Sequence, residues 1–476
     1  MSTRRVALNT LAPMAARIVD AAFALVYLRL LGRTDVGAYT FLVVFTTYLD
    51  TLIDFGLNAL VTREVARGEA SPARAFRTVN VLRLGLWALG LPVVAVVYGP
   101  LRGIVNLPDD AVLAGLLFYL ALLPSVLAKT ATGLLWAAER LEFTAAVSIG
   151  TTLLRVSIGG VALLAGLGLV GLGAASLLVN VFSATALVIL AVRYAGARHT
   201  TPDITRGPGH WLRESWPLFV NQLLQGLFFK IDALLLPGLA SPAAAGVYAA
   251  AYRVSEGAGI VSSSFTLALF PRLAREHDLS GAYRLALRIL LKLGVPLAAG
   301  IALLSESIIG VVGGREYLPD SAVALSILIC YLPLSYANGL TQYVLIAAGR
   351  QRVLTAAFLA ALGFNLLANL WLIPRFSYVG AAWVTVFSEL VLLVPFRLVA
   401  ARVAPGVSLA REARAPLLAT LLMAPVVWWL RDALHPIAAM VAGCLVYPLG
   451  LWSLGGFDER EQRLVDRLLR LQRAGS

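Results

Sequence analysis

The stretch TTYLDTLIDFGLNAL, residues 46–60, has the apolar character of a membrane-spanning helix, yet it carries two carboxylates. Asp50 and Asp54 are four residues apart, so their side chains project from one face of a helix. A charged side chain at the bilayer centre costs about 2.5–3.5 kcal/mol on insertion scales, so such groups usually face a bundle interior or a wet cavity. The stretch therefore predicts a helical membrane protein with a charged interior.

The rest of the chain agrees with a membrane protein. Of its 476 residues, 59% are apolar and 14% are charged, with a mean hydropathy of +0.82, whereas a soluble domain carries about 25% charged residues. Apolar stretches long enough to cross a bilayer recur along the chain. We predict an all-α polytopic fold with about fourteen spans, at 6–31, 36–62, 79–98, 111–136, 143–165, 169–193, 212–236, 243–270, 283–305, 320–348, 353–373, 378–400, 415–430 and 434–455.

The basic residues predict the orientation of these spans. With the N-terminus inside, 28 of the 39 Lys and Arg residues fall in the cytoplasmic connections or the span ends that border them, 5 fall outside and 6 lie deeper within spans. This asymmetry follows the positive-inside rule and predicts a multi-pass protein of the cytoplasmic membrane with both termini in the cytoplasm. The net charge of +13 is thereby explained without a nucleic-acid partner. The first apolar run continues to Leu31, so we expect a retained span and not a cleaved signal peptide.

An internal repeat is visible at an offset of 209 residues. GAY at 37–39 returns as GVY at 246–248, and Arg83 corresponds to Lys292. The offset covers six spans, so both halves have the same orientation, which predicts two pseudo-symmetric lobes with substrate between them. We expect an N-lobe at 1–200, a C-lobe at 201–405, two extra helices at 406–456 and a tail at 457–476. Residues 458–473 have the pattern of an amphipathic helix on the membrane surface.

Charged residues within the spans are the candidate functional residues. The basic ones are Arg17, Arg29, Lys129, Arg155, Lys230 and Arg253, and the acidic ones are Asp20, Asp50, Asp54, Asp232, Glu256 and Glu389. Most lie on the first, second, seventh and eighth spans, so a two-lobe arrangement would bring them together across a cleft. Arg17 with Asp20, and Arg253 with Glu256, are spaced to pair on one helix face. The alternative is that these are ion pairs that hold helices together.

Asp50 and Asp54 have no basic residue three or four positions away, so two roles remain open for them. They could form a coupling site for H⁺ or Na⁺, or they could balance Arg17, Arg253 or Lys230 across a cavity. Neither cysteine lies in a metal-ligand pattern, and no Walker A sequence is present, so we expect no metal, no cofactor and no catalytic residues. Several amides are compatible with a sugar-lined cavity or with inter-helical hydrogen bonds: Asn58, Asn221, Gln222, Gln225, Asn338, Gln342, Asn365 and Asn369.

Two segments resemble a known family. LRLLGRTDVGAYTF…LIDFGLNALVTREVAR (28–67) and GLLWAAERLEF (133–143) are similar to the O-antigen and capsule flippases, which are the polysaccharide exporters of the multidrug/oligosaccharidyl-lipid/polysaccharide (MOP) superfamily, with its MATE-like fold. The resemblance implies a two-lobe transporter that moves a polyprenyl-diphosphate-linked oligosaccharide to the outer leaflet by alternating access. Membrane lipids and other polysaccharide-assembly proteins are then the expected partners.

The resemblance also implies a cationic cavity, which falls on Arg17, Lys230 and Arg253, with Lys129 and Arg155 as further candidates. Arginine suits a diphosphate because its planar fork forms paired hydrogen bonds with phosphate oxygens. The acidic residues Asp20, Asp50, Asp54, Asp232 and Glu256 would then couple an ion or balance the charge.

Three alternatives remain. A lipid II flippase or an ion-coupled drug exporter of the same superfamily would share the fold, although a drug exporter usually has twelve spans. A membrane glycosyltransferase or polymerase is disfavoured, because such enzymes generally need a sizeable extramembrane domain and no predicted outside loop exceeds roughly 15 residues. We therefore expect a transporter and not an enzyme.

Overall fold

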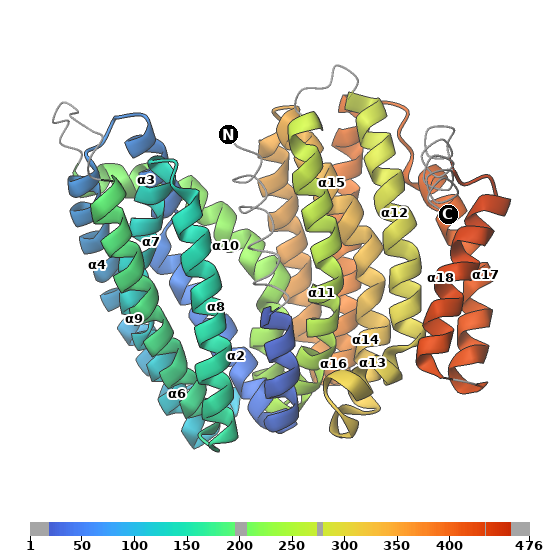
Figure 1. Ribbon diagram of the computed structural model, residues 1–476, viewed down its shortest axis with the longest axis horizontal. Coiled ribbons are helices and arrows are strands. Elements are labelled where there is room, and N and C mark those ends of the chain that lie inside the picture. Colours follow the sequence, from blue (N-terminus) through green and yellow to red (C-terminus); the bar gives the residue numbers. More distant parts are fainter. Residues whose placement is uncertain (1–18, 196–206, 274–278, 434, 458–476) are drawn as a thin grey trace, which may run out of the picture. The chain divides into compact units, whose positions relative to one another are not determined.

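The computed structural model describes residues 19–195, 207–273, 279–433 and 435–457 (Figure 1). Within these residues the regular structure is helical, and 11 helices are long and apolar enough to cross a membrane. One of them, α16 (Gln351–Val403), consists of two helices joined at Ser377, where φ is 53° and ψ is −137°. It therefore accounts for both predicted spans at 353–373 and 378–400. The prediction of an all-α polytopic membrane protein is confirmed.

The described chain forms two compact units. Unit 1 comprises residues 1–253, 312–316 and 366–381, and unit 2 comprises 254–311, 317–365 and 382–476. The helices wholly within unit 1 follow a stretch that is helical over 19–30; they are α2 (Arg33–Asp54), α3 (Leu57–Ala66), α4 (Pro72–Tyr98), α5 (Arg102–Val105), α6 (Asp109–Leu120), α7 (Leu122–Ala137), α8 (Leu141–Leu164), α9 (Gly168–Ala195) and α10 (Pro208–Leu239). Helix α11 (Pro242–Leu273) begins in unit 1 and continues in unit 2.

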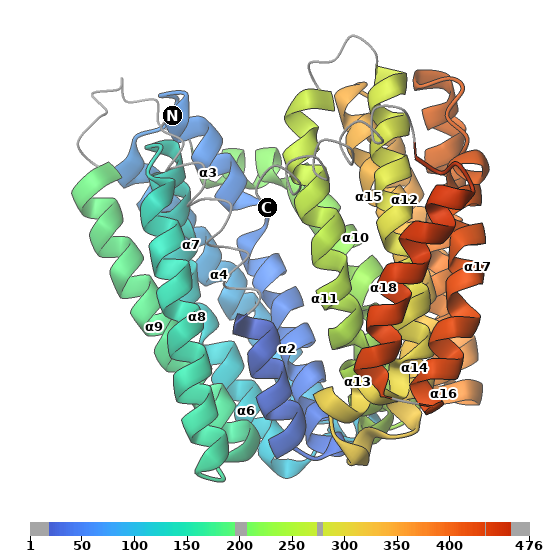
Figure 2. The ribbon, with the colours of Figure 1, turned by 45° about the vertical axis from the view of Figure 1, so that its right-hand side comes forward.

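The later elements belong mainly to unit 2. They are α12 (Leu279–Leu303), α13 (Ser305–Val312), the 3₁₀ turn η1 (Arg315–Tyr317), α14 (Asp320–Leu328), the 3₁₀ turn η2 (Ile329–Tyr331), α15 (Leu332–Ala347), most of α16, α17 (Leu409–Ala433) and α18 (Pro436–Ser453). Helices α17 and α18 pack side by side as a hairpin, drawn in red in Figure 2. They correspond to the two extra helices predicted at 406–456.

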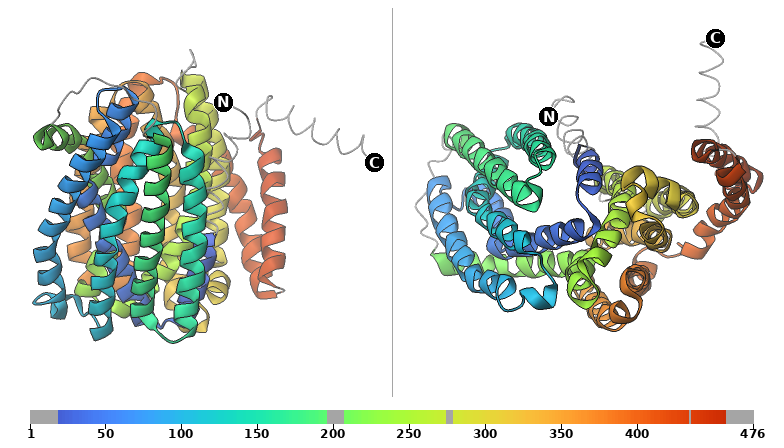
Figure 3. Two further views of the ribbon diagram at one scale, coloured as in Figure 1. Left: turned by 60° about the vertical axis from the view of Figure 1, so that its left-hand side comes forward. Right: turned by 90° about the horizontal axis from the view of Figure 1, so that it is seen from below.

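Packing in unit 1 is organised around α9. This helix lies against α6, α7 and α8, and most helices of the unit are seen end-on in the right panel of Figure 3 because they run along a common direction. Small and branched apolar residues fill the contact of α7 with α9: Ala128, Ala131, Leu135, Ala184, Leu187 and Ala191. Because lipid is as apolar as these side chains, close packing and buried polar bonds must hold the helices together.

The quoted stretch around residue 55 contains a helix break. Helix α2 ends at Asp54, Phe55 (φ 49°) and Gly56 (φ 73°) are both left-handed, and α3 begins at Leu57. A Cβ atom on Gly56 would lie 2.8 Å from Leu218 Cβ and 2.9 Å from Ser215 O of α10. Glycine is thus required here both by the backbone and by the approach of α10. The predicted span at 36–62 corresponds to the candidate membrane span Arg33–Ala66, but the break inside it was not predicted.

The repeated glycines lie at a tight helix crossing. A Cβ atom on Gly37 of α2 would lie 1.8 Å from Pro242 O, and a Cβ atom on Gly246 of α11 would lie 1.9 Å from Arg33 O. The offset of 209 relates Arg33 to Pro242 and Gly37 to Gly246. The repeat therefore converts one contact, Gly37 with Pro242, into the other, Gly246 with Arg33. This reciprocity is expected of a two-fold arrangement. This crossing supports the predicted repeat.

The predicted lobe boundaries remain a prediction. The two compact units do not divide near residue 200, because α10 belongs to unit 1. This helix packs against α2, and the Tyr48 hydroxyl donates a hydrogen bond to Gly226 O at 3.0 Å. The amphipathic tail predicted at 458–473 and most of the first predicted span lie outside the described residues.

Candidate functional site

The two carboxylates of the quoted stretch each form an ion pair. Asp50 Oδ2 lies 2.7 Å from Lys129 Nζ on α7, and Asp54 Oδ1 lies 2.6 Å from an Arg83 Nη on α4. One turn of α2 is thereby tied to two different helices. Charge balance, one of the two roles open for these residues, is thus shown in geometry, but the partners are Lys129 and Arg83 and not the expected Arg253 or Lys230. A coupling role for the pair remains a prediction.

Arg83 is a residue that the sequence analysis misplaced. It lies near the start of the predicted span 79–98, and the prediction counts it with the basic residues of the preceding cytoplasmic connection and not with the charged residues inside spans. The structure instead buries its side chain completely within α4. Its second Nη donates a hydrogen bond to Thr130 Oγ1 at 2.5 Å, and Thr130 in turn donates to Asn80 Oδ1 at 2.5 Å. The repeat carried a signal for it, because Lys292 at the corresponding position is also buried, within α12.

Arg155 forms a different kind of pair. On α8, an Arg155 Nη lies 3.1 Å from Asp20 Oδ1, with about half of the side chain exposed on each partner. An exposed pair of this kind is worth about 0–1 kcal/mol, whereas a buried pair is costly to break. The Arg155 side chain is therefore held less firmly than the buried Arg83 side chain. Arg17, the predicted partner of Asp20, lies outside the described residues.

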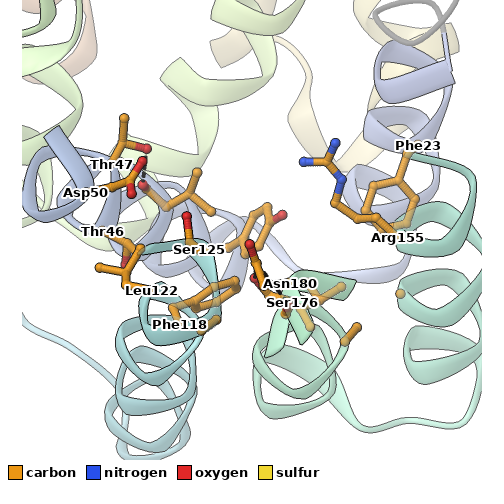
Figure 4. A pocket seen from close by; sticks show the side chains of 16 residues that line it. Phe23, Thr46, Thr47, Asp50, Phe118, Leu122, Ser125, Arg155, Ser176 and Asn180 are labelled. Carbon is orange, nitrogen blue, oxygen red and sulfur yellow. Dashed lines mark hydrogen bonds between the residues drawn. The ribbon is translucent and has the colours of Figure 1, made fainter. Parts of the chain in front are cut away.

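A cavity of about 300 Å³ lies inside unit 1 and brings several of these residues together. Figure 4 shows Arg155 and Phe23 at one end, Thr46, Thr47 and Asp50 at the other, and Ser125, Ser176 and Asn180 between them. Further lining comes from Tyr39, Val43, Phe118, Ala121, Leu122, Gly159, Leu172 and Ala175. Of the predicted site residues, Arg155 and Asp50 line this cavity. The Ser and Asn side chains were not predicted, because single polar residues in apolar helices carry no periodic signal.

Arg253 is linked to this cavity through aromatic rings of unit 1. Its Nε donates a hydrogen bond to the Tyr27 hydroxyl at 2.7 Å, and its guanidinium carbon lies 5.8 Å from the centre of the same ring. The Tyr27 and Tyr39 ring centres are 5.1 Å apart, and Tyr39 lines the cavity. The predicted cation is thus held behind an aromatic wall of the cavity.

The remaining predicted residues lie on α10 and α11. Asp232 is buried and accepts a hydrogen bond from the Tyr248 hydroxyl at 2.5 Å, while Lys230 Nζ lies 6.0 Å from the centre of the Tyr252 ring. These contacts join the two helices within unit 1. Glu256 belongs to unit 2, and its role remains a prediction.

Two predicted amides form structural hydrogen bonds in unit 2. Asn338 Nδ2 donates to Glu389 Oε2 at 2.6 Å, and Asn365 Nδ2 donates to Ser388 Oγ at 3.0 Å across the kink of α16. Of the two roles open for these amides, Asn365 thus shows the inter-helical hydrogen bond. In the part of the chain that the structure describes, no group of three or more His, Cys, Asp and Glu side chains is placed to hold a metal ion.

Many spanning helices, with a cavity among them lined by both polar and aromatic side chains, give this chain the architecture of a polytopic membrane transporter. Two solved structures share the fold over most of this chain. One is the lipid II flippase MurJ in an inward closed conformation, with a TM-score of 0.71 and 13% identity, covering 93% of this chain and 97% of MurJ. The other is an inward-facing MATE family multidrug resistance transporter of the MOP superfamily, with a TM-score of 0.64 and 16% identity, covering 83% and 96%.

Sequence comparison identifies the family within that class. A family model described as polysaccharide biosynthesis protein matches residues 2–277, more than half of the chain, and a MatE model matches 217–371. The chain belongs to this polysaccharide biosynthesis family of the MOP superfamily. A Shigella dysenteriae protein provisionally named an O-antigen transporter is 26% identical over 197 residues. That match covers 40% of this chain and 48% of the relative, about half of its length.

Proposed function

We propose that this protein is a flippase that moves a polyprenyl-diphosphate-linked oligosaccharide from the cytoplasmic to the outer leaflet by alternating access. Family membership supports a role in polysaccharide biosynthesis, and the fold supports transport. The observation that carries the proposal is the exposed Arg155 at the end of a polar cavity, where its guanidinium has only a weak ion pair to give up.

The ion pair of Arg155 with Asp20 explains how a diphosphate would bind. A phosphate accepts two parallel hydrogen bonds from a guanidinium, and these charge-assisted bonds are roughly twice as strong as neutral ones. Asp20 orients Arg155 while the site is empty of substrate, so little reorganisation is needed when the phosphate replaces the carboxylate. The prenyl chain stays in lipid, because the hydrophobic effect opposes its entry into a wet cavity.

The paired charges also suit a transporter that must return without substrate. Lys129 with Asp50, and Arg155 with Asp20, are close to neutral as pairs, so the empty site carries no uncompensated charge through the membrane. Coupling to H⁺ or Na⁺, a position in the cytoplasmic membrane with both termini inside, and cooperation with other polysaccharide-assembly proteins are parts of the same proposal.

Native mass spectrometry of the gently extracted protein tests this function. We expect a retained polyprenyl-diphosphate saccharide that is lost in Arg155→Ala and kept in Arg375→Ala. Arg375 is a suitable control because it lies over the Trp371 ring of its own helix and does not line the cavity. Retention of bulk phospholipid alone, together with binding of added cationic drugs, would favour a drug exporter instead.

A further inference from the structure

The cavity of unit 1 has the lining expected of a carbohydrate site. A sugar ring has an apolar face of C–H groups and an edge of hydroxyls, so it needs aromatic surface together with donors and acceptors. Phe23, Tyr39 and Phe118 supply the aromatic surface, and hydroxyl and amide side chains lie between the two charged ends (Figure 4). Ligand sites typically combine apolar walls with a few placed polar groups in this way.

Two polar groups of the lining have capacity left for a ligand. The Thr46 hydroxyl is buried and has no hydrogen-bond partner among the described residues. Asn180 Nδ2 donates to Ser176 O at 2.9 Å, but its Oδ1 accepts no hydrogen bond from the residues that the structure describes. An unpaired buried polar group costs free energy that a hydroxyl-bearing ligand would recover.

The charges and the size of the cavity select among ligands. Asp50 already has the Lys129 ammonium at 2.7 Å, so a cation would have to displace it. A volume of about 300 Å³ is at the low end for small-molecule sites and suits one sugar ring, not a whole oligosaccharide. Arg155 at the end of the cavity would place the diphosphate next to that ring.

We propose that this cavity binds the uncharged sugar residue attached directly to the diphosphate of the lipid carrier. Asn180, Ser125 and Thr46 contact its hydroxyls, and Phe118 packs against its C–H face. The assignment rests on the proposed function and adds a specificity site to it, because the sugar that starts the glycan would decide which lipid-linked chains are accepted.

Titration of the purified full-length protein with two lipids tests the assignment. The probes are the lipid-linked saccharide fraction extracted from the source cells and the same polyprenyl diphosphate without sugar, with affinities measured by native mass spectrometry. Loss of one or two neutral hydrogen bonds corresponds to about a three- to tenfold change. We expect Asn180→Ala to lower the affinity for the saccharide lipid by this factor and to leave the affinity for the sugar-free lipid unchanged.

Asn221→Ala is the matched control. Its amide forms the same type of bond, from Nδ2 to the carbonyl of Pro217 four residues earlier, but it does not line the cavity, so neither affinity should change. If Asn180→Ala does not fold, Ser125→Ala and Phe118→Leu serve in its place. An unchanged preference for the saccharide lipid in these variants would overturn the sugar site alone. A wild-type protein that binds neither lipid would overturn the proposed function itself.

Discussion

At the scale of single residues, two kinds of ion pair in unit 1 have different physical roles. Arg83 and Asp54 are buried, and their 2.6 Å bond continues into Thr130 and Asn80. Arg155 and Asp20 are half exposed beside a cavity. Because water weakens an ion pair and burial makes its loss expensive, breaking the first pair should destabilise the fold, whereas we propose that the second can give up its arginine to a ligand.

Removal of each arginine should separate these roles. Arg83→Ala leaves Asp54 as an unpaired buried charge, so we expect a loss of about 3–5 kcal/mol in the free energy of unfolding. Arg155→Ala should cost less than about 1 kcal/mol and should abolish surface polysaccharide. Thermal unfolding in detergent and surface staining of intact cells measure the two effects. Equal destabilisation by both substitutions would contradict the distinction.

The pair of Asp50 and Lys129 should tolerate exchange of its two charges. Asp50→Lys alone places two ammonium groups where the structure has a 2.7 Å ion pair, so we expect export to fail. The double variant with Lys129→Asp restores opposite charges, and export should recover in part. Recovery would show that the pair acts as a charge balance, whereas export that stays absent would point to a specific role of the Asp50 carboxylate.

At the scale of elements, the break between α2 and α3 positions these pairs. Phe55 and Gly56 end α2 directly after Asp54, so the carboxylate lies in the last turn of α2, immediately before the break. The aromatic ring of Phe55 stacks on Phe219 of α10 with the ring centres 4.5 Å apart. The backbone of α10 closes over Gly56, so the break is held from outside by a third helix.

Gly56→Ala should therefore be much more harmful than an ordinary glycine substitution. The left-handed φ of 73° costs a residue with a Cβ atom about 1–2 kcal/mol, and the collision with the α10 backbone adds to this cost. Gly85→Ala on α4 is the control, because nothing lies within 4 Å of its Cβ position and helix propensity favours alanine there. We expect a lower unfolding temperature for Gly56→Ala only. Similar temperatures for both variants would show that the break is not constrained.

Much of the helical architecture and some of the charged residues of the cavity could be predicted from sequence. Apolar length and flanking charges located the helices, because a bilayer demands long apolar runs with satisfied backbones. The break at Phe55 and Gly56 was missed, because the sequence IDFGL is as apolar as the sequence of an unbroken spanning helix. The left-handed backbone of these two residues is fixed by the contact with α10, which the sequence does not show. Arg83 was missed for a similar reason, because only tertiary structure brings Asp54 to it. Arg155 and Asp50 were found, since charge inside a span is itself a signal.

At the scale of the whole molecule, the distribution of basic residues predicts the orientation in the membrane. Cysteine labelling tests it in a variant without Cys330 and Cys444. Ala73→Cys lies in a connection predicted to be cytoplasmic and Gly103→Cys in one predicted to be outside, and both positions are exposed in the structure. A membrane-impermeant maleimide should label Gly103→Cys in intact cells and Ala73→Cys only after lysis. The opposite pattern would invert the orientation.

Translocation of lipid by the purified protein is the most direct test of the proposed flippase function. Proteoliposomes would carry a fluorescent polyprenyl-diphosphate saccharide, and a membrane-impermeant quencher would report how much of it changes leaflet, with and without an H⁺ or Na⁺ gradient. We expect movement with the wild-type protein, loss of movement with Arg155→Ala and retention with Arg375→Ala. Equal movement in empty liposomes and in all three proteins would contradict this expectation.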